Sequence, residues 1–185
     1  MSDAPAYAST YTEDDYYSLP ENIRAELING QIYYMSAPSR MHQEILGFIF
    51  KKIAYYIDGK RGDCKVYPAP FAVKLFEDNS KTVVEPDISV ICDPNKLTDQ
   101  GCTGAPDWIT EIVSPSNPGH DYVRKLNLYM DAGVREYWIV NPNEQEVLVY
   151  FGEQDNFKVK SYTFQDKIEV NIYDNLWIDF KELDL

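Results

Sequence analysis

The sequence predicts one α/β domain built on a mixed β-sheet. Apolar runs of strand length recur along the chain, and two segments between them carry apolar residues at helical spacing. The chain has 185 residues, 44% of them hydrophobic, which suffices for one core and is short for two domains. We therefore expect a flexible tail over residues 1–10 and a single domain over residues 11–185.

The N-terminal part of that domain is expected to contain a short helix, a β-hairpin and a long helix. TEDDYYSLPEN places acidic residues at a helix start, with Thr12 as its cap. In RAELINGQIYYM, Asn29 and Gly30 supply the two positive-φ positions of a type I′ turn between apolar strands. A helix then runs from Ser39 to the glycines at 59–62. Its apolar stripe consists of Ile45, Ile49, Ile53 and Ile57.

Three strands should follow this helix. They lie in CKVYPAPFAVKLF (64–76), which Pro68 and Pro70 interrupt, in TVVEPDISVIC (82–92) and in PDWITEIVS (106–114). Pro86 has no N–H to donate, so it lies where strand pairing begins or at a sheet edge. The segment before the third strand contains Gly101 and Gly104 and is expected to be a loop.

The C-terminal half predicts a second helix and further strands. The helix starts at Asn117 and Pro118, runs to about Ala132 and ends at Gly133. EYWIVN is apolar enough to be a strand buried on both faces. VLVYF and FKVKSYTF then form a hairpin, and IEVNIYDNLWIDFKEL adds one more strand and a short tail. These elements make a C-terminal β extension.

Charge and hydropathy limit the classes of function. The net charge of −13 repels a phosphate backbone overall, although local basic positions exist. Those positions are Lys51, Lys52, Lys60, Arg61, Lys65, Arg124 and Lys125. No apolar run is long enough to span a membrane, and the acidic N-terminus lacks a signal pattern. Cys64, Cys92 and Cys102 are odd in number and have no CxxC spacing, so we expect reduced thiols in a cytoplasmic protein.

Two predicted strands each carry one carboxylate among apolar neighbours. Asp87 shares a strand face with Ser89, and Glu111 shares one with Ile109 and Val113. An ionised carboxylate in a buried strand is costly unless another charge or a metal compensates it. If the two strands are neighbours in register, both carboxylates meet at one end of the sheet.

Such a pair is suited to a divalent cation. Mg²⁺ and Mn²⁺ prefer oxygen ligands, and the backbone carbonyl of Ile112 would be an available third one. The cation would polarise a phosphoryl oxygen and lower the pKa of an attacking water. A nearby lysine, such as Lys125 on the second helix, would stabilise the developing charge or help to deprotonate the water.

Each candidate also has a purely structural explanation. Asp87 could cap a turn, Glu111 could belong to a salt bridge, and Lys125 could pair with Asp121 at the i,i+4 spacing of helix surfaces. His42 lies one turn before Ile45, on the buried side, where a satisfied core histidine is common.

Three further residues have competing interpretations. Glu26 is next to the hairpin and could face solvent. Tyr129 shares the helix face of Lys125 and is expected to serve core packing. Asp107 follows Pro106 and repeats the PD dipeptide, which makes it a rival to Asp87, but it lies close to Glu111 on the same strand.

Several motifs together resemble a known superfamily. The order of ELINGQIYYM, PSRMHQEI, EPDISVICD, GAPDWITEIVSPS, DYVRKLNLY and GVREYWIVNP resembles the PD-(D/E)XK nucleases, and within them the Uma-type family of proposed restriction endonucleases. This resemblance implies a restriction-endonuclease-like core of helix, three strands, helix and strand. The N-terminal hairpin and the C-terminal β extension would be added to that core.

The resemblance also implies roles for individual residues. A divalent metal would lie between Asp87 and Glu111. The superfamily lysine two positions after the glutamate is replaced by Val113, and Lys125 stands at the place to which this family has moved it. Glu26 and His42 match family positions; Glu26 would help to hold the metal or orient a water, and His42 would lie beside the site.

The function expected from these observations is a metal-dependent endonuclease that uses Mg²⁺ or Mn²⁺ to hydrolyse phosphodiester bonds in DNA. One alternative is a catalytically inactive nuclease-fold dimer that acts as a binding or regulatory module. Another is a hydrolase of smaller phosphate esters. A homodimer is expected. Its interface could use aromatic residues that could equally belong to the core, namely Trp138, Tyr150, Phe151, Tyr162 and Trp177.

Overall fold

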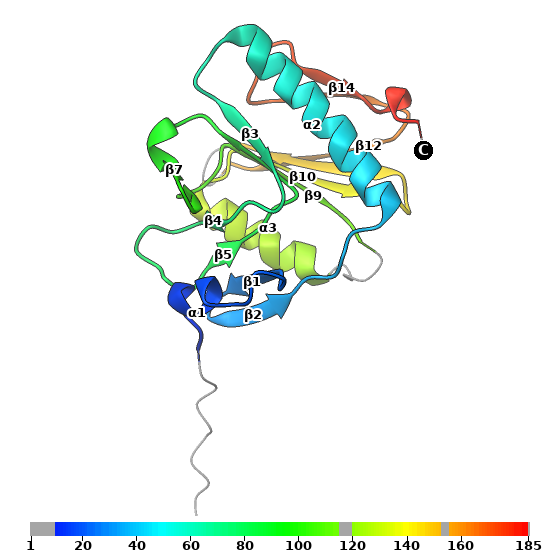
Figure 1. Cartoon of the computed structure of the whole chain (residues 1–185). Coiled ribbons are helices and arrows are strands. Elements are labelled where there is room, and N and C mark those ends of the chain that lie inside the picture. Colours follow the sequence, from blue (N-terminus) through cyan, green and yellow to red (C-terminus); the bar gives the residue numbers. More distant parts are fainter. Residues whose placement is uncertain (1–9, 115–119, 153–155, 185) are drawn as a thin grey trace, which may run out of the picture.

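Two six-stranded mixed sheets and one two-stranded sheet form the framework of the protein (Figure 1). The computed structural model describes residues 10–114, 120–152 and 156–184. The α/β class is confirmed, whereas the expectation of one mixed sheet is wrong. Most of the expected tail, residues 1–9, lies outside the described residues.

One of the large sheets, the central sheet, has the strand order β12-β11-β10-β9-β6-β3. Its strands are β3 (Lys65–Pro68), β6 (Ile88–Ile91), β9 (Trp108–Ile112), β10 (Glu136–Asn141), β11 (Glu146–Phe151) and β12 (Lys158–Thr163). Only β9 and β10 are parallel neighbours in it. Helix α2 (Arg40–Lys60) precedes β3, and helix α3 (His120–Ala132) connects β9 to β10, because parallel neighbours need a crossover.

The other large sheet, the second sheet, has the order β2-β1-β5-β4-β8-β7. Its strands are β1 (Ala25–Ile28), β2 (Gln31–Tyr34), β4 (Val73–Lys74), β5 (Val83–Val84), β7 (Leu97–Thr98) and β8 (Gly101–Thr103). Helix α1 (Glu13–Tyr17) precedes it, as expected. Asn29 and Gly30 join β1 to β2 with φ of 50° and 80°, which confirms the predicted turn.

Two expectations for residues 82–105 are wrong. The segment 82–92 is not one strand: β5 pairs in the second sheet and β6 in the central sheet. Pro86 lies between them, where its missing N–H ends the ladder. The expected loop contains a 3₁₀ turn, η1 (Pro94–Lys96), and the β7–β8 hairpin. A Cβ at Gly101 would lie 2.1 Å from the Ala72 oxygen, so only glycine fits beside β4.

The C-terminal region also differs from its prediction. In place of one strand it forms the antiparallel pair β13 (Lys167–Glu169) and β14 (Trp177–Asp179). A 3₁₀ turn, η2 (Phe180–Glu182), replaces the expected tail. The hairpin β11–β12 is confirmed, as are the strand β10 and the end of α3 before Gly133. The expected start of α3 at Asn117 and Pro118 lies outside the described residues.

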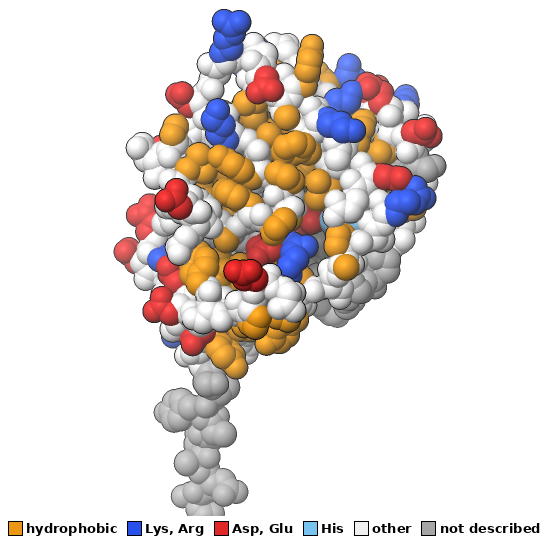
Figure 2. Space-filling model, viewed as in Figure 1, with side chains coloured by type: hydrophobic (Ala, Val, Ile, Leu, Met, Phe, Trp, Pro, Cys, Tyr) orange, Lys and Arg blue, Asp and Glu red, His pale blue; other side chains and the backbone are white. Residues whose placement is uncertain are grey.

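The surface shows the acidic composition unevenly. On the face in Figure 2, Asp and Glu side chains gather mainly along the lower left, and Lys and Arg side chains mostly in the upper part, around α2. Hydrophobic side chains occupy the middle of the same face. In the described part of the chain, no helix combines the length and the apolar character needed to cross a membrane.

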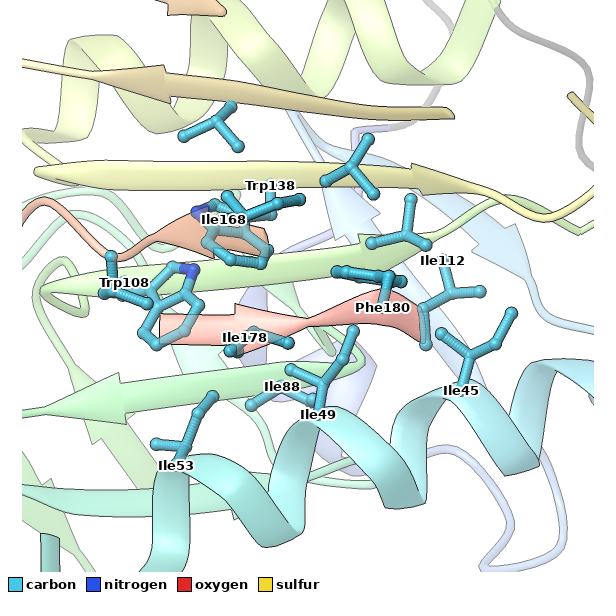
Figure 3. Close-up of a cluster of buried hydrophobic side chains, with 14 of the residues drawn as sticks. Ile45, Ile49, Ile53, Ile88, Trp108, Ile112, Trp138, Ile168, Ile178 and Phe180 are labelled. Atoms are coloured by element: carbon cyan, nitrogen blue, oxygen red, sulfur yellow. The ribbon is translucent and has the colours of Figure 1, made fainter. Parts of the chain in front are cut away.

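One face of the central sheet is covered by α2 and the C-terminal pair of strands (Figure 3). The isoleucine stripe of α2 is buried there, as its spacing predicts, and packs on alternate residues of β6, β9 and β10. Trp108 and Trp138 lie in this cluster with ring centroids 5.0 Å apart. Trp138 is therefore a core residue and not part of a surface, whereas Trp177 is 43% exposed.

The opposite face of the central sheet packs on α3 and the second sheet. Ile91, Ile109 and Tyr137 contribute to this cluster from the central sheet, and Leu128 and Tyr129 from α3. Because side chains alternate along β9, Glu111 lies on the face that carries Ile109 and turns toward α3. Because α3 and the second sheet both pack on this face of the central sheet, Glu26 of the second sheet and Glu111 of the central sheet both lie next to α3.

The cysteines correct an expectation. Cys64 and Cys92 form a disulfide bond, so the prediction of three reduced thiols is wrong, and Cys102 alone is free and buried. β3 and β6 are antiparallel with Lys65 opposite Ile91, which places the next pair of residues, the two cysteines, opposite each other. Spacing rules concern cysteines in short motifs, so they do not predict a pair that is 28 residues apart. The cysteine pattern therefore gives no support to a cytoplasmic location.

Breaking this disulfide should lower stability. Closure of a loop between residues 28 apart is worth about 3–4 kcal/mol of unfolding free energy. We expect dithiothreitol to reduce the free energy of unfolding in urea by about that amount. The control is the double variant Cys64→Ala/Cys92→Ala, which should be insensitive to the reductant. An equal response of both proteins would show that the bond does not form in solution.

Candidate active site

The five residues singled out from the sequence lie together in the structure. Glu26 is on β1, His42 in the first turn of α2, Asp87 directly before β6, Glu111 on β9 and Lys125 on α3. All five are buried, with exposures between 3% and 8%. Four separate elements and one connection therefore supply a single polar cluster between the two large sheets.

The pairing of β6 and β9 brings the two strand carboxylates together. These strands are antiparallel with Ile88 opposite Thr110, and continuing the register by one residue sets Asp87 opposite Glu111. The backbone N–H of Ile112 donates to Asp87 Oδ2 over 2.7 Å. His42 Nε2 lies 3.1 Å from the same oxygen. The condition that the two strands be neighbours in register is thus met.

The ammonium of Lys125 joins the two sheets. Its Nζ lies 3.0 Å from Glu111 Oε1 on the central sheet, and 2.9 Å and 2.8 Å from Glu26 Oε1 and Oε2 on the second sheet. It therefore reaches the site from the following helix. The alternative pairing with Asp121 concerns a side chain outside the described residues.

Glu26 faces the interior and not solvent. Its Oε1 also accepts a hydrogen bond of 3.0 Å from the backbone N–H of Glu85. Glu85 in turn accepts from the Tyr16 hydroxyl at 2.8 Å and from Arg24 at 3.1 Å. The β1 strand and the connection between the two sheets thus hold this carboxylate in a fixed direction.

Tyr129 belongs to the cluster, whereas its position in the sequence predicts a role in core packing. Its hydroxyl donates to Glu111 Oε1 over 2.7 Å, and its side chain is fully buried. The i,i+4 spacing from Lys125 was the available signal, because both residues project from one helix face. Burial and the neighbouring Glu111 raise the pKa of Tyr129, so the hydroxyl keeps its proton and acts as a donor.

Asp107, the alternative to Asp87, lies outside this cluster. Asp107 precedes β9, while Glu111 lies near the other end of that strand. Asp107 Oδ2 accepts from the backbone N–H of Cys92 at 2.8 Å, and its Oδ1 lies 3.3 Å from Arg135. It therefore has a structural role at the end of the sheet that carries the disulfide.

The ionisation of the cluster follows from burial and charge. Burial raises the pKa of Glu111 to about 7; Lys125 opposes this rise, and Asp87 and Glu26 add to it. For Lys125, burial lowers the pKa, but Glu111 and Glu26 outweigh burial and raise it above the ordinary value. Lys125 is consequently protonated at neutral pH.

The donor set of this cluster fits a hard cation. Three carboxylates, those of Glu26, Asp87 and Glu111, face one ammonium, which leaves negative charge to be compensated. Among the described residues, no three His, Cys, Asp or Glu side chains are already arranged to hold a metal ion. Lys125 contacts Glu26 and Glu111 Oε1, so Asp87 and the other oxygen of Glu111 are the groups that would hold a cation.

Comparisons with known proteins place the chain in a family. The model of the Uma2 family, described as "Putative restriction endonuclease", matches residues 13–181, so the chain belongs to this family. The resemblance to the Uma-type family inferred from the motifs is confirmed. The chain is 26% identical over 147 residues to "Uncharacterized protein slr1290" of Synechocystis sp. (strain PCC 6803), covering 78% of this chain and 75% of that protein.

A solved structure shares the fold. It is the crystal structure of "a putative nuclease belonging to DUF820" from Anabaena variabilis ATCC 29413. The match has a TM-score of 0.76 at 23% identity and covers 93% of this chain and 96% of that one. The arrangement of two mixed sheets with α2 and α3 is therefore an architecture found in an experimental structure.

The raised pKa of Glu111 predicts a pH-dependent stability. The folded pKa of about 7 lies above the ordinary 4.5, so the folded state binds this proton more tightly. The resulting stabilisation is fully present below about pH 4.5 and is lost as the pH rises through about 7. In urea unfolding with EDTA, Glu111→Gln should flatten this decline between pH 4.5 and 8. An identical decline in parent and variant would contradict it.

Removing the ammonium should destabilise the protein strongly. Lys125→Met leaves Glu26 and Glu111 buried without their counter-charge, which costs about 3–5 kcal/mol at pH 8. The loss should be smaller at pH 5, where a carboxyl group can take up a proton. Lys51→Met, on the exposed side of α2, is the control and should change stability by about 0.5 kcal/mol or less. Equal effects of the two substitutions in urea unfolding would refute the role of the ion pair.

Proposed function

We propose that the protein is a divalent-metal-dependent endonuclease that hydrolyses phosphodiester bonds in DNA. The observation that carries this proposal is the convergence of Asp87, Glu111 and Lys125 in one buried cluster, in a chain from a family described as "Putative restriction endonuclease". Mg²⁺ or Mn²⁺ is the cofactor that such oxygen ligands favour.

Under this proposal the elements around the site form a restriction-endonuclease-like core. Among the described residues, α2, β3, β6, β9, α3 and β10 follow one another in the order helix, three strands, helix and strand, interrupted by strands of the second sheet and by the 3₁₀ turn η1. The β1–β2 hairpin and the β-structure after β10 are additions to this core. The hairpin is not peripheral, because β1 supplies Glu26.

Asp87 and Glu111 would hold the metal, with the backbone carbonyl of Ile112 as an additional oxygen ligand. The metal supplies a polarised phosphoryl oxygen and a water of lowered pKa. His42 contacts Asp87 Oδ2 from α2, and Glu26 anchors Lys125 and would help to orient a water. The side chains to which we assign these roles are held by the contacts of the metal-free cluster.

The raised pKa of Lys125 decides between the two roles expected of a nearby lysine, namely deprotonation of the water and stabilisation of the developing charge. A lysine that stays protonated at neutral pH cannot act as a general base. Lys125 therefore contributes positive charge and N–H donors to the phosphoryl group as negative charge develops on it. Of the two roles open to a nearby lysine, electrostatic stabilisation is the one that this environment supports.

The acidic composition is compatible with DNA as the substrate only through local charge. Basic side chains gather mostly around α2 in Figure 2, away from the most acidic edge, and a bound divalent cation adds positive charge at the cluster. The proposal therefore requires phosphate contacts near the site and not over the whole surface. The binding of DNA should therefore depend more on the metal in this protein than in a nuclease with a basic surface.

Cleavage of supercoiled plasmid tests the proposal. The parent protein should nick it with Mg²⁺ or Mn²⁺, and EDTA should abolish the activity. Asp87→Asn and Glu111→Gln should each lower the rate by at least about 100-fold, because each removes a charge from the site. Asp99→Asn, at an exposed turn, is the matched control and should cleave like the parent.

Three results would decide against the proposal. Full activity of both site variants would show that the cluster is not the active site. The lack of cleavage of DNA, together with no metal binding in calorimetry, would favour the alternative of an inactive nuclease-fold dimer that binds a partner. Cleavage of small phosphate esters but not of DNA would instead indicate a smaller substrate.

A further inference from the structure

We infer that Tyr129 is a positioning residue that fixes the orientation of the Glu111 carboxylate and thereby selects the oxygen that Glu111 presents to a metal. For its consequence in catalysis, this inference rests on the proposed function. That Tyr129 orients the Glu111 carboxylate is inferred from the contacts of these residues and does not depend on the proposed function.

The contacts fall on one oxygen of the carboxylate. The Tyr129 hydroxyl lies 2.7 Å from Glu111 Oε1, and Lys125 Nζ lies 3.0 Å from the same atom. Both donors come from one face of α3, one turn apart, so they approach Oε1 as a unit. Neither of them engages Oε2. That oxygen is therefore the one that Glu111 can offer to a cation shared with Asp87.

The ring of Tyr129 is itself held in place. It is fully buried and packs edge-on against Tyr137 of β10, with ring centroids 4.9 Å apart. The backbone oxygen of Tyr129 accepts from the N–H of Val134 at 3.0 Å, where α3 ends. A buried ring that packs on Tyr137, on a backbone held at the end of α3, directs its hydroxyl at one point, so the donor is positioned before any ligand arrives.

Lys125 cannot replace this function. Its ammonium is shared between Glu111 and both oxygens of Glu26, and its flexible chain allows it to follow either carboxylate. Without the hydroxyl, the Glu111 carboxylate would keep one shared donor on Oε1 and could rotate about its last side-chain bond. The ordinary alternative is a core tyrosine that merely satisfies its hydroxyl, which predicts a change in stability only.

Tyr129→Phe separates these two interpretations. It removes the hydroxyl and keeps the ring that packs in the core. In metal-free crystal structures, the Glu111 carboxylate should be ordered in the parent and displaced or present in two orientations in the variant. Calorimetric titration with Mn²⁺ alone should show an affinity lower by about tenfold or more, as for other groups that orient a metal ligand.

Tyr150→Phe is the matched control, since Tyr150 is a partly buried tyrosine in the same hydrophobic cluster. It should leave both the Glu111 carboxylate and the Mn²⁺ affinity as in the parent. If Tyr129→Phe fails to fold, Tyr129→Leu removes the hydroxyl with an apolar residue of smaller volume and has the same expected result.

An unchanged Glu111 carboxylate in the metal-free variant overturns the inference, whatever happens to stability. A parent protein that binds no Mn²⁺ refutes the metal in the proposed function, but the comparison of Glu111 in the two metal-free structures still decides the role of Tyr129. A displaced carboxylate with lower Mn²⁺ affinity supports both.

Discussion

The ion pair of Lys125 with Glu26 and Glu111 is the interaction on which the arrangement of the site depends. It is the point at which the second sheet, the central sheet and α3 meet, and all three side chains are almost inaccessible to solvent. Buried carboxylates from two sheets would repel each other without a cation between them. The ammonium therefore makes it possible for the two sheets to approach with charged residues facing inward.

The same ion pair leaves the cluster acidic. One ammonium offsets part of the charge of three carboxylates. The pKa of Glu111 is raised first by burial and then by the charges of Asp87 and Glu26, and Lys125 only partly opposes this rise. A divalent cation beside Asp87 would supply the missing positive charge. Lys125 would then stay in place as a charged donor. The features that stabilise the metal-free fold are thus the features from which the proposed chemistry follows.

Helix α2 is connected to β6 near both of its ends. His42 in the first turn contacts Asp87 just before β6, and the disulfide between Cys64 and Cys92 joins the segments that follow α2 and β6. Between these points, the isoleucine stripe of α2 packs on the central sheet. The position of Asp87 is therefore set by core packing and by two links to one helix, in addition to the pairing of β6 with β9.

The sequence by itself determined the local features: the stripe and bounds of α2, the turn at Asn29 and Gly30, and the buried strands β9 and β10, because short-range periodicity and turn chemistry specify these. It also singled out Asp87 and Glu111 as carboxylates in buried strands, and the family resemblance of its motifs indicated Lys125. It did not separate β5 from β6, reveal the pairing of Cys64 with Cys92, or show that Tyr129 contacts Glu111. These depend on which strands become neighbours and on which side of a helix meets them. Strand pairing between distant residues is settled by the packing of the whole chain, and only the tertiary structure decided it.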